Sequence, residues 1–273
     1  MNTSLIHFFE GIYKNIVKIP IISPNNKVKF VWDFLVMLTT LCHFFIIVFV
    51  FTFQAHDFNK IYEHWLSTLI ILIPIDVLFK VNSGFFEKGS AIEDRRQILR
   101  KYCRTDLPYD LICFVTLIVN LHVKHLNLIQ ILYVVKIPIF HNLLENFEEI
   151  INFDEKIEAF IALLEHFIKM LFFAHLVACL WFYIGSSTDD DESSWLIAKG
   201  YTEKPIFFQY IVSLYWAITT ITTTGYGDIT AQNEAEFAFC LSVMIMGSIF
   251  FGYSLTYIGK VFDKLQKDQR MKK

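Results

Sequence analysis

The sequence predicts an all-α membrane protein with six transmembrane helices and one re-entrant helix. Of its 273 residues, 55% are hydrophobic and 29 are phenylalanine, whereas apolar residues make up about 45–50% of an average soluble domain. Six apolar runs are separated by short polar stretches, at residues 30–53, 65–81, 111–121, 126–140, 157–184 and 237–262. Because a helix needs about 20 apolar residues to cross a bilayer, six crossings leave no room for a large soluble domain.

The composition argues against several other classes of protein. The net charge of −3 is small and the basic residues are scattered, so no nucleic-acid partner is expected. The five cysteines stand alone, without the paired spacing of zinc or redox sites. The sequence has no Ser/His/Asp, Cys/His or phosphate-loop arrangement. The chain is therefore not expected to be an enzyme or to hold a resident cofactor.

Basic residues in the short loops predict the orientation. They gather before the first run, after the second and after the sixth, and cytoplasmic loops are the ones enriched in Lys and Arg. Both terminal segments, residues 1–29 and 263–273, are therefore expected in the cytoplasm. The acidic run at residues 189–192 falls on the outer side.

Residues 206–222, between the fifth and sixth runs, form an aromatic and β-branched stretch that is amphipathic. The stretch ends in the string Thr222-Thr223-Thr224-Gly225-Tyr226-Gly227-Asp228. Non-helical backbone at membrane depth is tolerated only where protein or a water-filled cavity covers it. We therefore interpret the stretch as a re-entrant segment, with residues 210–222 as a pore helix.

The string predicts a filter that replaces the water shell of a potassium ion with main-chain oxygens. The donors would be the carbonyls of Thr223, Thr224, Gly225 and Tyr226 and the Thr223 hydroxyl, repeated from four chains around one axis. Successive carbonyls point the same way only if the backbone handedness alternates, which Gly225 and Gly227 permit. The alternative is an ordinary turn in a membrane loop, which does not account for the short aromatic helix before it.

Around the filter, the residues resemble those of the voltage-gated-like potassium channel superfamily. The similar segments are Ser213-Leu214-Tyr215-Trp216, Thr224 to Asp228 with Ala231, Asn233 and Glu236, and Ala178-Cys179-Leu180-Trp181. Within that superfamily they are most similar to plant inward-rectifier channels, which are relatives of the ether-à-go-go and cyclic-nucleotide-gated families. The resemblance implies a tetramer in the plasma membrane, with three further subunits and the lipid bilayer as partners and K⁺ as the permeant ion.

The resemblance also implies how the chain is divided. Residues 30–142 would form a four-helix sensor, residues 143–156 a connection and residues 157–262 the pore domain. Tyr215, Trp216 and Asp228 would support the filter, with the first two rings bracing that of Tyr226. Channels of this branch usually continue into a nucleotide-binding domain, so a chain ending at Lys273 is expected to be truncated or to gate without that domain.

The fourth apolar run departs from the family pattern. Sensors carry Arg or Lys at every third position, but that register here is Lys124, Asn127, Gln130, Tyr133, Lys136 and Ile139. With Lys136 as the cation inside the run, we expect weak voltage dependence. A lysine inside a membrane needs an acidic partner. We expect an ion pair with Asp76, shared with Asp110; the alternative is that Lys136 snorkels to the inner surface.

Helix six and the outer histidines supply two further hypotheses. Gly247 and Gly252 would serve as hinges or allow close helix packing. Tyr257, Ile258 and Val261 would form a hydrophobic gate at the inner end of the pore. The outer side carries four histidines that would bind zinc or sense protons, unless they are scattered interfacial residues: His56, His64, His122 and His125.

Three functions remain open from the sequence. The leading one is a potassium-selective channel subunit with a weak voltage sensor. Selectivity depends on the surroundings of a filter as well as on its residues, so a nonselective cation channel of the cyclic-nucleotide-gated kind is an alternative. A non-conducting modulatory subunit of a heteromeric channel is the other, although the intact filter string argues against it.

Overall fold

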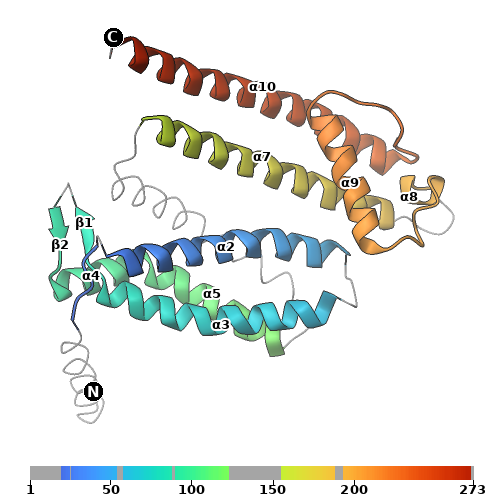
Figure 1. Cartoon of the computed structure of the whole chain (residues 1–273). Coiled ribbons are helices and arrows are strands. Elements are labelled where there is room, and N and C mark those ends of the chain that lie inside the picture. The colour runs from blue at the N-terminus through green and yellow to red at the C-terminus, as the bar shows by residue number, and fades with distance from the viewer. Residues whose placement is uncertain are drawn as a thin grey trace. The chain divides into compact units, whose positions relative to one another are not determined.

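A computed structural model of the chain describes residues 20–24, 26–53, 58–87, 90–122, 155–187 and 193–271 (Figure 1). The chain divides into two compact units. The N-terminal unit comprises the residues up to Phe44 together with Lys60–Ile151. The C-terminal unit comprises Phe45–Asn59 and Asn152–Lys273.

Helices make up most of the described N-terminal unit. They are the first part of α2 (Lys27–Phe53), then α3 (Phe58–Asn82), α4 (Arg95–Thr105) and α5 (Leu107–His122). A two-stranded antiparallel hairpin, β1 (Phe85–Glu87) and β2 (Ser90–Ile92), joins α3 to α4, with Phe85 paired to Ile92. A parallel bridge between Ile22 and Ser83 ties the segment before α2 to the end of α3.

The short helix α4 was not predicted from the sequence. Its Ile98 and Tyr102 are buried while most of its basic residues are exposed, so it is amphipathic and packs one face on the unit. Asp94 is its N-cap residue, and Asp106 ends it with a backbone N–H that donates to the Tyr102 carbonyl. Burial, and then the negative charge of Asp110, raises the pKa of Tyr102. This phenol therefore stays protonated and can donate a hydrogen bond.

The C-terminal unit combines the last part of α2 with α7 (Glu155–Ser186), α8 (Trp195–Ala198), α9 (Ile206–Ile221) and α10 (Glu234–Met271). Both α7 and α10 pack on α9, and they also pack on each other. The buried core at this junction is rich in aromatic residues, with Trp181, Trp195 and Trp216 among them. The packing therefore holds α9 against two long helices.

Four helices are long and apolar enough to cross a membrane, namely Lys27–Phe53, Ile61–Val81, Lys156–Ser186 and Glu234–Gln266. They confirm the first, second, fifth and sixth predicted runs as helices. The third run is the shorter apolar helix α5, and α9 is a second short apolar helix. The fourth run, residues 126–140, lies outside the described residues. The count of six crossings therefore stays a prediction, whereas the chain is an integral membrane protein.

We expect Gly185→Ala to destabilise the end of the C-terminal unit where α8 packs on α7. A Cβ at this position of α7 would lie 2.2 Å from Nε1 of Trp195, so the indole must move and the cost is about 1–3 kcal/mol. The melting temperature of the detergent-purified protein should fall. Gly252→Ala is the matched control because nothing lies within 4 Å of the added Cβ in α10. An equal melting temperature for the two variants would contradict the packing described.

Candidate ion-conducting site

The candidate filter begins at the carboxyl end of α9. After Ile221 the helical hydrogen-bond pattern changes, and the Thr219 carbonyl accepts from the amide of Thr224 at 2.9 Å and from that of Gly225 at 3.1 Å. The amide of Thr223 donates to the carbonyl of Thr220 at 3.1 Å. The first amides of the filter therefore donate to carbonyls in the last turn of α9. The carbonyls of the filter are left for other partners.

The backbone alternates in handedness through the filter. φ is −78° at Thr222, +59° at Thr223, +53° at Gly225 and +71° at Gly227. Among the described residues Thr223 is the one non-glycine with a positive φ, so Thr224 and Tyr226 do not share it. This is the alternation that the sequence analysis requires for carbonyls that point the same way.

Thr223 was not expected to take part in the alternation. A β-branched residue at positive φ is a true outlier, and such a conformation costs of order 1–3 kcal/mol. Backbone strain of this kind is found where function requires a particular geometry. Sequence reasoning assigned the freedom to Gly225 and Gly227 alone, and no propensity would have placed it at a threonine.

In the single chain, the filter has an open side. All residues from Thr223 to Asp228 are exposed, and the Tyr226 side chain is 70% exposed. A Cβ at Gly225 or Gly227 would meet nothing within 4 Å. A large exposed aromatic ring and bare main chain are unusual on a finished surface. The geometry therefore fits a site that further chains complete.

Two of the three predicted filter supports contact the filter. The Tyr215 and Tyr226 rings stack, with centroids 6.3 Å apart and planes 4° apart. The hydroxyl of Tyr215 interacts with the carboxylate of Asp228. The third, Trp216, is buried and its ring stacks on that of Trp181 at 3.9 Å. Its role in bracing the Tyr226 ring stays a prediction.

Three tryptophans form an aromatic stack behind the filter. The rings of Trp181 and Trp195 lie 5.5 Å apart at 13°, and Trp216 adds the third ring. The indole N–H of Trp195 donates to the carbonyl of Trp181 at 3.2 Å. Sequence reasoning did not assign Trp195 to the site, since its partner lies on a different element. The stack fixes α9 to α7, and so positions the filter indirectly.

The buried carboxylate of Glu236, in the first turn of α10, holds the loop on each side of the filter. It is fully buried. It accepts from the amide of Trp195 at 3.0 Å and from that of Gln232 at 2.8 Å. Asn233 adds to this arrangement, because its side chain accepts from the Glu236 amide at 2.9 Å and donates to the Ser193 carbonyl at 3.2 Å. One carboxylate thus ties the segment before α9 to the segment after the filter.

The gate proposed on α10 is not tested by the contacts of the described chain and stays a prediction. Tyr257 stacks on His166 of α7, with ring centroids 4.6 Å apart. Ile258 and Val261 are half-buried on the same stripe, while Ile249, Thr256 and Phe262 are exposed. Tyr257 therefore packs against α7 within the chain.

The two glycines of α10 have different surroundings. A Cβ on Gly247 would lie 3.2 Å from the Cα of Ile221, so this glycine allows α10 to approach the end of α9 closely. This observation favours the packing alternative for Gly247. Gly252 has nothing within 4 Å of its Cβ position. Its role as a hinge stays a prediction.

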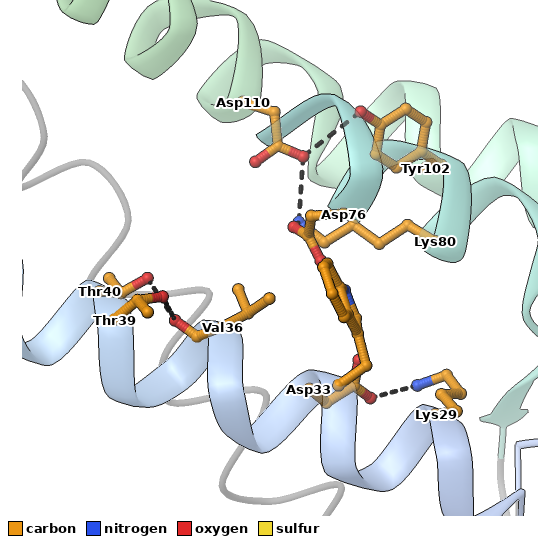
Figure 2. Close-up of polar contacts among 10 residues, drawn as sticks. Lys29, Asp33, Val36, Thr39, Thr40, Asp76, Lys80, Tyr102 and Asp110 are labelled. Atoms are coloured by element: carbon orange, nitrogen blue, oxygen red, sulfur yellow. Dashed lines mark hydrogen bonds and ion pairs between the residues drawn. The ribbon is translucent and has the colours of Figure 1, made fainter. Parts of the chain in front are cut away.

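The predicted sensor residues are only partly described. Lys136 lies outside the described residues, so its ion pair stays a prediction. Asp76 and Asp110 do come together, and Lys80 bridges them (Figure 2). Sequence reasoning missed Lys80, although its position four residues after Asp76 on a helix is a signal for an ion pair.

The outer histidine site is not tested by the described residues. His64 is exposed near the start of α3. The side chains of His56, His122 and His125 lie outside the described part of the chain. Within that part, no group of three or more His, Cys, Asp or Glu residues is placed to hold a metal ion.

We expect Glu236→Gln to destabilise the loops before α9 and after the filter. A side-chain amide offers one acceptor and one donor, so one of the two amides that the carboxylate serves would face an N–H₂ group, at a cost of about 1–3 kcal/mol. The readout is the melting temperature of the purified protein. Glu234→Gln should change it little, because Glu234 lies in the same first turn of α10 but its side chain is exposed. If both variants melt alike, the Glu236 clamp does not hold the loops.

Comparison with known proteins identifies the family. The model of the ion transport protein family matches residues 29–270. The potassium channel AKT1 of Arabidopsis thaliana is 25% identical over 63% of this chain and 20% of its own length. The potassium channel KAT2 of the same plant is 34% identical over 30% of this chain and 12% of its own length. The potassium channel AKT2 of Oryza sativa subsp. japonica is 36% identical over 28% of this chain and 9% of its own length.

The chain thus spans at most 20% of the length of these relatives. The matches confirm the resemblance to plant potassium channels that the filter residues indicated. They also agree with the expectation that the chain is not an enzyme. With a family match that includes all the described helices from α3 to α9 and nearly all of α2 and α10, the chain belongs to the ion transport protein family.

Proposed function

We propose that this chain is a subunit of a potassium-selective channel, in which four chains surround one conducting axis. The observation that carries the proposal is the alternating backbone from Thr222 to Gly227, exposed on one side. A potassium ion leaves its water shell only where oxygens replace it, and rings of main-chain carbonyls are a known solution. One chain supplies one strand of such a ring, so several chains are needed to close it.

The position of α9 also supports cation conduction. A helix carries about half a negative charge at its carboxyl end, and this end of α9 is directly continuous with the filter at Thr222. The charge lies where a dehydrated cation would sit, and it needs no ionised side chain inside the membrane. The names of the relatives, all potassium channels, support K⁺ as the permeant ion.

The orientation and the sensor belong to the same proposal. Both termini face the cytoplasm of a plasma-membrane channel, as the basic loops indicate. Voltage dependence is weak because Lys136 is the cation in the fourth apolar run. The gating stimulus is therefore something other than a strong electrical pull on that run.

We expect Gly225→Ala to abolish potassium selectivity. Alanine at a φ of +53° costs about 1–2 kcal/mol, so the carbonyls should rotate away from the axis and the K⁺ over Na⁺ preference should drop by about tenfold or more. Reversal potentials of protein in planar bilayers, with K⁺ replaced by Na⁺, measure this. Gly200→Ala is the matched control, since Gly200 has a φ of +65° and open space around it but lies outside the filter.

The same recording separates the alternatives. A wild-type reversal potential that ignores the K⁺ gradient indicates a nonselective cation channel. No current from the chain alone, with current after co-expression with another channel subunit, indicates a modulatory subunit. Equal selectivity loss in the Gly225 and Gly200 variants would contradict the role given to the filter.

We expect a shallow conductance–voltage curve for the wild-type chain. One charge crossing the field is worth about 2.3 kcal/mol per 100 mV, and steep sensors move 3–4 charges per subunit, so a single lysine supplies roughly a third of that work or less. Lys136→Gln should flatten the curve further. A wild-type curve as steep as that of a fully charged sensor would exclude this part of the proposal.

A further inference from the structure

The exposed face of α4 is strongly basic. The eleven residues of this helix include five Arg or Lys side chains and no acidic one. Arg96, Arg100 and Arg104 lie four residues apart, so they follow one side of the helix, and all three are exposed. We call them the arginine stripe. Like charges at this spacing repel one another, so the stripe favours an anionic partner.

The other two basic residues of α4 fix the helix to its own unit. Arg95 is buried, and its Nη1 donates to Oδ1 of Asn82 at the end of α3 at 2.8 Å. The Lys101 ammonium lies 3.7 Å from the centroid of the Phe85 ring in β1. These contacts hold α4 to α3 and to the hairpin, while the arginine stripe remains exposed.

Exposed apolar side chains follow the arginine stripe along the chain. Leu107, the first residue of α5, comes directly after the last turn of α4, which contains Arg104. Leu107, Leu111 and Val115 are exposed at four-residue spacing. Exposed apolar rows of this kind mark contact with a membrane. The change from arginine to leucine therefore marks the boundary between lipid headgroups and acyl chains, where cationic side chains are favoured.

The start of α2 marks the same boundary independently. Ile22 bridges to Ser83, directly after α3. This places the start of α2 beside the end of α3, from which the hairpin leads to α4 (Figure 1). Lys27 is exposed there, and the exposed side chains of Val28 and Val31 follow it. Two elements thus change from basic to apolar at one end of the N-terminal unit.

We propose that the arginine stripe binds the phosphate groups of anionic lipids in the cytoplasmic leaflet, so that α4 lies in the headgroup layer. A guanidinium group can donate two parallel hydrogen bonds to a phosphate, and the cytoplasmic leaflet carries the anionic lipids. In naming the leaflet, the inference rests on the orientation given in the proposed function. Lipid binding itself does not depend on ion conduction.

A lipid fits this surface better than other anionic partners do. Its phosphate meets the arginine stripe, and its acyl chains meet the apolar row that begins at Leu107. Free phosphate would satisfy the charge alone. The same holds for the acidic segment of this chain at residues 145–154, which lies outside the described residues.

The test is the melting temperature of the full chain in an uncharged detergent, with short-chain phosphatidylglycerol added. This anionic lipid in large excess should raise the wild-type value by about 4 °C or more, whereas short-chain phosphatidylcholine should not. Arg96→Gln with Arg100→Gln should increase the phosphatidylglycerol concentration needed for a given rise about 25-fold, or about fivefold for each arginine. Lys199→Gln with Lys204→Gln is the matched control, because it removes the same charge from two exposed lysines of the C-terminal unit.

Further arms separate the partners. Arg96→Lys with Arg100→Lys keeps the charge and should keep most of the lipid response, and inorganic phosphate should not replace the lipid. An equal rise with phosphatidylcholine or with inorganic phosphate would overturn the proposal. So would an unchanged lipid response in the glutamine variant.

One more result would assign the stripe to the acidic segment at residues 145–154 instead. It is a wild type without lipid response, together with a glutamine variant that melts lower in detergent alone. If the protein conducts no ions, the proposed function fails, but these melting curves still decide whether the arginine stripe binds anionic lipid.

Discussion

The constraint on which the C-terminal unit depends is that the non-helical backbone after α9 must find hydrogen-bond partners for its amides. Lipid offers no hydrogen bonds, so the amides of such a stretch need partners inside the protein. The Thr219 carbonyl provides one of them by accepting two amides. Because that carbonyl belongs to the last turn of α9, the filter can be only as well placed as α9 itself.

The surroundings of α9 meet this requirement from several sides. The tryptophan stack fixes it to α7, Gly247 lets α10 approach its end, and His175 of α7 binds its Tyr210 at 3.0 Å. The other ring nitrogen of His175 faces the Phe45 carbonyl of α2 at 3.0 Å, and a carbonyl only accepts. The proton is therefore assigned to Nε2, and Nδ1 accepts from the Tyr210 hydroxyl. A neutral imidazole thus ties α2, α7 and α9 together within the C-terminal unit.

Apolar runs were enough to locate the helices, because hydrophobic length is what a bilayer selects. They did not locate the elements whose residues are mostly polar. The basic stretch after α3 was interpreted only as an orientation signal, so α4 and the hairpin were missed. The end of α10 was placed at residue 262 although the helix continues to Met271, since no glycine or proline interrupts its polar last turns.

For the candidate site, the sequence located the filter string but not what holds it. Three features depend on tertiary packing, which local sequence patterns do not encode. They are the positive φ at Thr223, the Trp181–Trp195 stack and the stack of Tyr257 on His166. Lys80 is a different case, because its spacing from Asp76 was readable. It lies near the end of an apolar run, where a lysine is ordinarily assigned to the membrane interface.

The two units therefore solve one problem, polar groups in lipid, in different ways. The C-terminal unit satisfies the first amides of the filter string on the last turn of α9, so it needs rigid support for that turn. The N-terminal unit pairs its carboxylates internally through Lys80.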